Sequence, residues 1–194
     1  PAWDEELEFY SIKVPDGPLT SELQKIVPGD TVLLRQKSTG TLVNDALLPG
    51  KRLHLIGSGT GLAPWMSIIR DPDAYERYEQ ITVQHTVRDI QDLAYREELE
   101  ARMEHDPLVG ELAVTRLTYD QSVTKCPTWT GENRRITTRI ECGDYPLNPE
   151  TDRVMLCGSM AMIKDHAADL ERRGFEEGAN NKPGQFVIER AFVG

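Results

Sequence analysis

The feature that most constrains the fold is a regular alternation of strand and helix patterns that begins after Gly50. Short apolar stretches, each typical of a buried strand, alternate with segments of helical periodicity. Neighbouring parallel strands need a long crossover connection, which is usually a helix. The alternation therefore predicts an α/β fold with a doubly wound parallel sheet and helices on both faces. The expected strands are Leu53–Gly57, Ile81–Thr86, Leu112–Leu117, Val154–Cys157 and Phe186–Glu189, and the expected helices are Leu62–Arg70, Leu93–Met103, Thr137–Cys142 and Met160–Arg172.

The residues before Gly50 have a different pattern. Leu7–Val14 alternates as a strand does, and Thr31–Arg35 is a second short strand candidate. Between them, Pro18–Ile26 is expected to form a short helix, because proline and glycine bound it at both ends.

Composition and charge exclude several classes of protein. The 194 residues include 22 basic and 32 acidic side chains, which gives a formal net charge of −10. This balance argues against binding to nucleic acid, whose phosphates attract clustered Lys and Arg, and against an anionic membrane surface. No apolar run approaches the about 18 residues that a membrane-spanning helix needs. The first residues lack the basic and apolar regions of a secretory signal, so none is expected.

The spacing of the cysteines argues against a metal centre held by this chain. Cys126, Cys142 and Cys157 form no C-x-x-C pair, so neither a zinc site nor an iron–sulfur cluster is expected. Their odd number favours a reducing cytoplasm over a disulfide framework. The four histidines also lack ligand spacing, so structural or surface roles are expected. If this chain moves electrons, the iron must be on a partner.

The strongest local motif is GSGTGLAP at residues 57–64, between a strand and a helix. Alternating glycines allow a tight turn and a close approach to a ligand, and the following helix offers free N–H groups to an anion. Leu62 replaces the third glycine of the dinucleotide fingerprint, and no Lys-Ser/Thr follows as in a phosphate-binding loop. The motif indicates either a nucleotide site or a plain strand–turn–helix corner.

The residue after the second strand bears on the choice of nucleotide. An NAD site usually has Asp or Glu there to bind the ribose hydroxyl. Here the strand Ile81–Thr86 runs into Arg88, and an arginine suits the 2′-phosphate of NADP. The alternative is a surface arginine paired with Asp89 or Asp92.

Further cations surround Thr118–Asn133, the longest irregular stretch and an expected surface loop. They are Lys125 and the pair Arg134-Arg135. An arginine pair could bind a phosphate bidentately, and the alternative is a solvated charged turn.

A third motif, Cys157-Gly158-Ser159-Met160, stands between a strand and a helix. Ser159 is a plausible N-cap of that helix. In a parallel sheet this strand end shares an edge with the glycine-rich turn, where ligands bind. Cys157 is either a small apolar core residue or a group of the site.

The order of the motifs GSGTGLAP, HTVR, SVTK, NRRIT, VMLCGSMAM and FVIERAFVG resembles the bacterial ferredoxin (flavodoxin)–NADP⁺ reductases over the whole chain. The resemblance implies that residues 1–48 are the C-terminal part of an antiparallel FAD-binding β-barrel. Residues 49–194 would be the NADP-binding domain with a C-terminal segment that covers the flavin. The family's Arg-x-Tyr-Ser flavin motif has no counterpart in the chain. The implied function is electron exchange between NADPH and ferredoxin or flavodoxin through hydride transfer to the flavin N5, by a cytoplasmic monomer.

The resemblance also assigns site residues. Those near FAD are Tyr10, Pro18, Leu19, Thr20, Thr60, Ala191 and Phe192. Those that bind NADP are Arg88, Thr124, Lys125, Arg135, Gly158, Ser159, Met160 and Asp165. Cys157 and Glu189 match the catalytic positions beside the nicotinamide. Two other functions stay open, an NADPH-dependent flavin or oxygenase reductase component and a nucleotide-binding fragment without turnover.

Overall fold

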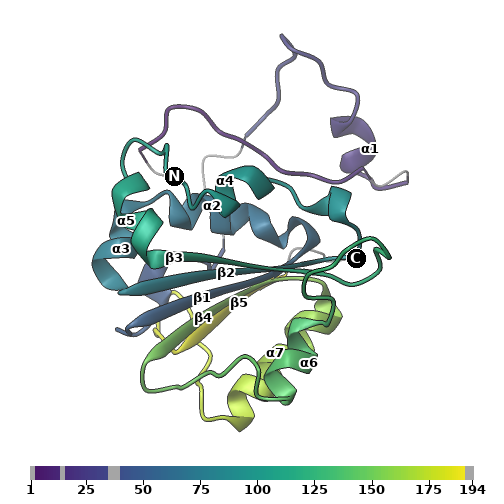
Figure 1. Ribbon diagram of the computed structural model, residues 1–194. Coiled ribbons are helices and arrows are strands. Elements are labelled where there is room, and N and C mark those ends of the chain that lie inside the picture. The colour runs from purple at the N-terminus through teal and green to yellow at the C-terminus, as the bar shows by residue number, and fades with distance from the viewer. Residues whose placement is uncertain (1–2, 14–15, 35–39, 191–194) are drawn as a thin grey trace.

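The computed structural model describes residues 3–13, 16–34 and 40–190. Within these residues, five parallel strands form one sheet in the order β3-β2-β1-β4-β5 (Figure 1). The strands are β1 (Arg52–Ser58), β2 (Gln80–Val87), β3 (Leu117–Val123), β4 (Asp152–Gly158) and β5 (Phe186–Arg190). Their apolar runs are buried almost throughout in β1 and β4, as expected for strands covered on both faces.

Helices cover both faces of the sheet (Figure 1). On one face lie α2 (Ala63–Ile69), α3 (Pro72–Arg77), α4 (Arg96–Glu100) and α5 (Gly110–Arg116), and on the other lie α6 (Ile136–Glu141) and α7 (Met160–Arg172). Short 3₁₀ helices are η1 (Asn44–Ala46), η2 (Gly59–Leu62) and η3 (Ile90–Asp92), and α1 (Thr20–Leu23) precedes the sheet. The fold class expected from the sequence, a doubly wound parallel α/β sheet, is confirmed.

Two apolar layers hold the sheet to its helices. In one layer Leu55 and Val83 pack in the same buried cluster as Trp65 of α2. In the other layer Ile56 clusters with Ile136 of α6. Because both layers are needed to bury the two faces of β1, the strand ends are fixed relative to the helices that follow them.

The strand order creates a switch point between β1 and β4. The chain runs outward from β1 through β2 to β3, and then returns to the other side of β1 to form β4. The connections at the carboxyl ends of β1 and β4 therefore leave on opposite faces, and ligands bind in the crevice between such strands. Register pairs Gly57 of β1 with Cys157 of β4 at this point.

Among the elements expected after Gly50, one strand and one helix differ from the sequence prediction. The expected strand Leu112–Leu117 is wrong, because these residues mostly belong to α5 and β3 begins only at Leu117. Val109 and Ala113 are buried four residues apart while Val114 and Thr115 are exposed, which is a helical and not an alternating pattern. The expected loop Thr118–Asn133 accordingly starts after β3, at Thr124.

The helix expected at Leu93–Met103 is shorter than predicted. It is realised as α4, over Arg96–Glu100. Tyr95 before it and Arg102 and Met103 after it have positive φ angles of 53°, 51° and 56°. A left-handed residue cannot continue an α-helix, so the backbone limits α4 at both ends.

The segments before residue 49 form none of the expected strands in the part that is described. Residues 7–13 and 31–34 are in no ladder, and Leu7, Phe9 and Leu33 are exposed. An alternating pattern becomes a strand only when a neighbouring strand pairs with it. The expected helix Pro18–Ile26 is reduced to α1. The division of the chain at residues 48 and 49 into barrel and NADP-binding domain stays a prediction.

The N-terminal segment is attached to the helical layer. The Trp3 indole Nε1 donates a hydrogen bond to the Arg70 carbonyl at 2.9 Å, and the Tyr10 and Tyr95 rings meet edge-on at 6.0 Å. Figure 1 shows this segment, in purple, passing above α2 and α4. No helix among the described residues combines the length and the apolar character needed to cross a bilayer.

Three of the four histidines are buried: His54, His85 and His166. His54 Nδ1 lies 2.8 Å from the Tyr145 hydroxyl, and His85 Nε2 lies 2.9 Å from the Gly59 carbonyl oxygen. His166 Nε2 is buried without a hydrogen-bond partner. Burial lowers the pKa of His85 and of His166 to about 4, so both rings are neutral at neutral pH.

A buried neutral histidine makes stability fall in acid. Below the unfolded-state pKa of about 6.5, His166 binds a proton in the unfolded chain. In the folded chain it binds that proton only near pH 4. We predict that His166→Leu reduces the loss of unfolding free energy between pH 7 and pH 5 by about 2 kcal/mol. Urea unfolding at both pH values measures this. His105→Leu is the control, because the His105 side chain is 91% exposed, and an undiminished pH dependence in His166→Leu would contradict the prediction.

Candidate nucleotide-binding site

The glycine-rich turn after β1 packs directly against the end of β4. A Cβ atom on Gly61 would lie 2.1 Å from the Cys157 carbonyl oxygen, so only glycine fits there. Gly59 has a φ of 55°, in the left-handed region. The Gly59 carbonyl can only accept a hydrogen bond, so the neutral His85 ring carries its proton on Nε2 and fixes this turn.

A second contact joins the same two strand ends. The Ser159 backbone N–H donates to Ser58 Oγ at 3.2 Å, and a Cβ on Gly158 would lie only 2.4 Å from that oxygen. Ser159 also caps α7, because its Oγ accepts a hydrogen bond from the Met162 N–H at 3.4 Å. The predicted N-cap is confirmed. Ser159 and Met160 are exposed, so the start of α7 borders the crevice with its free N–H groups.

Cys157 and Glu189 are neighbours in the register of β4 and β5. The Cys157 side chain is buried, and burial together with the charge of Glu189 raises the pKa of its thiol to about 12. The thiol is therefore protonated at neutral pH and is not a nucleophile. Cys157 is both a member of the main apolar core and a residue at the switch point, so the two interpretations of the sequence are compatible.

Glu189 is held by the segment that leads into the sheet. Its Oε2 accepts a hydrogen bond from the Thr41 N–H at 3.3 Å, and the Thr41 hydroxyl donates to the Ile188 carbonyl at 2.6 Å. Glu189 also lines a cavity of about 460 Å³ between residues 40–46 and α2, with Asn180 and Ser67.

The ends of β2 and β3 are bonded together beside this crevice. The Thr124 N–H and Oγ1 both donate to the Val87 carbonyl, at 3.0 and 3.1 Å, and the Lys125 N–H donates to the Arg88 carbonyl at 2.9 Å. Arg88 and Lys125 therefore leave adjacent strand ends, and both are exposed. Asp89 and Asp92 do not pair with Arg88, because their carboxylates form the capping box of η3.

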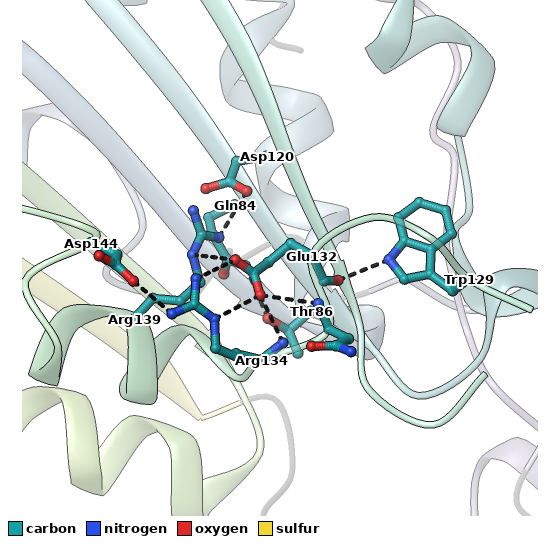
Figure 2. Close-up of polar contacts among 9 residues, drawn as sticks. Gln84, Thr86, Asp120, Trp129, Glu132, Arg134, Arg139 and Asp144 are labelled. Carbon is teal, nitrogen blue, oxygen red and sulfur yellow. Dashed lines mark hydrogen bonds and ion pairs between the residues drawn. The ribbon is translucent and has the colours of Figure 1, made fainter. Parts of the chain in front are cut away.

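The arginine pair after this loop is divided between two roles. Arg134 forms ion pairs with Glu132 at 2.8 Å and with Asp144 at 2.6 Å (Figure 2). Arg135 begins α6 as its N-cap residue and is exposed. Among the arginines whose side chains the structure describes, all but Arg88 and Arg135 form an ion pair or donate to a backbone carbonyl. The paired or bonded ones are Arg52, Arg70, Arg77, Arg96, Arg102, Arg116, Arg134, Arg139, Arg153, Arg172 and Arg173.

The residues that the resemblance assigns to FAD lie on several separate segments. Tyr10 is half-buried against Tyr95, Pro18 and Leu19 are exposed just before α1, and Thr20 is the first residue of α1. Figure 1 shows α1 apart from the sheet. Thr60 lies within η2 beside the crevice, and Asp165 is exposed on α7. Ala191 and Phe192 lie outside the described residues.

Sequence reasoning missed the side chains that support the site. Ser58 joins β1 to β4, His85 fixes Gly59, and Glu132 binds Arg134. Glu132 stands two residues before Arg134, and this nearby acid is a sequence signal that Arg134 differs from Arg135. The contacts of Ser58 and His85 depend on the sheet register and left no sequence signal.

A parallel sheet with glycine-rich turns at its switch point, and with cations beside it that form no ion pair within the described part of the chain, is the architecture of a nucleotide-binding domain. Residues 55–168 match the family described as oxidoreductase NAD-binding domain. The chain is 49% identical over 205 residues to flavodoxin/ferredoxin–NADP reductase of Rhodobacter capsulatus, covering 100% of this chain and 74% of that protein. It is 48% identical over 198 residues to ferredoxin–NADP reductase A of Sorangium cellulosum, covering 98% and 70%.

A solved structure agrees with these relatives. The ferredoxin NADP⁺ reductase of Neisseria gonorrhoeae with bound FAD and NADP superimposes with a TM-score of 0.79 at 28% identity, over 93% of this chain and 72% of that one. The chain belongs to the ferredoxin–NADP reductase family.

The close contact at Gly61 gives a test of the crevice. We predict that Gly61→Ala lowers the free energy of unfolding by about 3 kcal/mol, because the new methyl group would overlap the backbone of β4. Gly174→Ala is the control. Gly174 has a φ of 89° and open space around it, so its substitution should cost only about 1 kcal/mol of backbone strain. Equal losses in urea unfolding would show that the turn does not depend on this contact.

Proposed function

We propose that this protein is an FAD-dependent oxidoreductase that exchanges electrons between NADPH and ferredoxin or flavodoxin. The observation that supports it most is the group of open cations, Arg88, Lys125 and Arg135, beside a glycine-lined crevice in a chain of net charge −10. The other described arginines of this acidic protein form ion pairs or hydrogen bonds to backbone carbonyls. Exposed cations near the carboxyl ends of β2 and β3 are therefore suited to an anionic ligand.

These cations fit the 2′-phosphate of NADP. Arg88 and Arg135 can each offer a planar guanidinium to phosphate oxygens, and Lys125 supplies a point charge. The single hydroxyl proton of Thr124 is already donated to Val87. Thr124 therefore contributes chiefly by holding Lys125 next to Arg88.

At the other end of the crevice, we assign Cys157 and Glu189 to the nicotinamide. Bound FAD would supply hydride transfer and one-electron steps, and the protein would supply alignment. The neutral thiol of Cys157 offers an uncharged wall, while Glu189 keeps a carboxylate oriented by the Thr41 N–H. Gly158, Ser159 and Met160 border the nucleotide at the start of α7, with Asp165 a weaker contact on that helix.

The assignment of FAD rests on family membership and on the gonococcal reductase, which was solved with FAD and NADP. From the described residues, Thr60 in η2 and the half-buried Tyr10 are assigned to FAD, with Pro18, Leu19 and Thr20 at the start of α1. Ferredoxin or flavodoxin is proposed as the partner because the names of the relatives in Rhodobacter capsulatus and Sorangium cellulosum include one or both. A monomer acting in the cytoplasm completes the proposal.

The first prediction of the proposed function concerns the choice of nucleotide. A charge-assisted hydrogen bond contributes about 1.5–3 kcal/mol, so Arg88→Ala and Arg135→Ala should each weaken NADP⁺ binding about 10- to 100-fold. NAD⁺ lacks the 2′-phosphate, and its affinity should change little. Calorimetric titration of the flavin-loaded protein with each nucleotide measures both effects. Arg172→Ala, at the exposed end of α7, is the control. Equal losses for the two nucleotides would remove the physical basis of the NADP assignment.

The second prediction concerns the nicotinamide end. Cys157→Ala should slow hydride transfer from NADPH more than it weakens NADP⁺ binding, because Cys157 lies at the β4 end and away from the three cations. Stopped-flow reduction of the flavin and calorimetric titration separate the two quantities. Cys142→Ala is the matched control, since Cys142 is exposed after α6. Unchanged hydride transfer in Cys157→Ala would leave Cys157 as a core residue only.

A further inference from the structure

Glu132 has an unusual number of contacts for a loop carboxylate (Figure 2). Its Oε1 accepts hydrogen bonds from the backbone N–H groups of Asn133 and Arg134 at 3.0 and 2.9 Å. The same carboxylate receives the Arg134 guanidinium in a bidentate pair, with Nε at 3.0 Å and Nη2 at 2.8 Å. Arg134 lowers the pKa of Glu132 to about 2, so the carboxylate is charged at any working pH.

The backbone of Glu132 anchors the loop as well. Its carbonyl accepts hydrogen bonds from the Val123 N–H at 3.0 Å and from the Trp129 indole at 2.8 Å. The Trp129 ring in turn lies under the Arg96 guanidinium of α4, 5.5 Å from the ring centre. The returning end of the loop is thereby bound to the end of β3, just as its outgoing end is bound to β2 through Thr124 and Lys125.

The carboxylate also faces α6 and β3. Arg139 of α6 lies 3.5 Å from Glu132 and pairs with Asp120 of β3 at 2.9 Å. Arg134 extends to Asp144 beyond the end of α6. Glu132 thus holds the last residues before Arg135, where α6 begins, in a fixed relation to the sheet.

The position of this pair in the loop suggests its purpose. The loop carries two of the three open cations, Lys125 near its start and Arg135 at its end. Binding a phosphate orders both the cationic side chains and the loop that carries them, and a backbone that is already held in place removes the loop's share of this entropy cost. In addition, pairing with Glu132 and Asp144 withholds the Arg134 guanidinium from the ligand.

We propose that Glu132, paired with Arg134, is a positioning residue that sets the preference for nucleotides with a 2′-phosphate. It does so by fixing the direction in which the chain enters Arg135 and by holding the loop that carries Lys125. This role rests on the proposed binding of the 2′-phosphate by Arg88, Lys125 and Arg135.

The test compares Glu132→Ala, Arg134→Ala and the double variant by calorimetric titration with NADP⁺ and NAD⁺ in the flavin-loaded protein. Each single variant should weaken NADP⁺ about five- to tenfold and NAD⁺ less than about twofold, and the double variant should lose no more than the worse single one. Glu132→Gln keeps an acceptor for the two backbone N–H groups and should recover part of the loss. Glu141→Ala, an exposed acid on α6 with no ion pair among the described residues, should match the unsubstituted protein.

Other outcomes overturn the proposal. If Arg134 bound the phosphate itself, Arg134→Ala would weaken NADP⁺ while Glu132→Ala, by freeing that arginine, would strengthen it. Equal losses for NADP⁺ and NAD⁺ would mean that Glu132 only supports the fold. Arg135→Ala, titrated in parallel, separates the two proposals: if it lowers NADP⁺ affinity selectively and Glu132→Ala does not, only the positioning role fails. If Arg135→Ala has no selective effect, the phosphate site itself fails.

Discussion

The missing side chain at Gly61 lets the turn after β1 touch the backbone of β4, and the rest of the site depends on that contact. β1 and β4 are adjacent only because the chain reverses its direction of growth after β3. At this reversal the connections diverge onto opposite faces and leave a crevice, where the Ser159 N–H donates to Ser58 Oγ and joins the two strand ends. The buried His85 then fixes the Gly59 carbonyl from the neighbouring strand. The glycine that permits the close contact therefore lies at the point where the strand order reverses.

The pairing of charges explains how an acidic chain leaves Arg88 and Arg135 exposed and without an ion pair among the described residues. Most described arginines are bonded to acids or to backbone carbonyls, and these bonds join elements together, as Arg139 joins α6 to Asp120 of β3. Arg88 and Arg135 are left open although acids stand near both in sequence. Asp89 and Asp92 are occupied by the η3 capping box, and Glu132 is occupied by Arg134. The availability of a cation is thus decided by what its acidic neighbours already bind.

The sequence predicted the central sheet well and the supporting contacts poorly, for physical reasons. β1 and β4 are buried almost throughout and have a glycine at or next to their last residue, Gly57 and Gly158, and the α7 boundaries follow from its Ser159 cap and from Gly174. The segment Leu112–Leu117 was predicted as the wrong element, because a short apolar run does not distinguish a helix face from a strand. Glu132 is a sequence signal that Arg134 differs from Arg135, but only the fold brings the second partner, Asp144, to Arg134.

The two ends of the crevice carry side chains of opposite charge, and this constrains how a ligand can lie in it. Glu189 on β5 and Arg88 after β2 are separated by three strand spacings, about 14 Å at the usual distance between strands. Glu189 would repel a phosphate, while Arg88, Lys125 and Arg135 attract one. The protonated Cys157 adds no charge between them, because burial keeps its thiol neutral. Under the proposed function, an extended dinucleotide with a 2′-phosphate would therefore have one favourable orientation, with that phosphate near the ends of β2 and β3 and the nicotinamide beside Cys157 and Glu189.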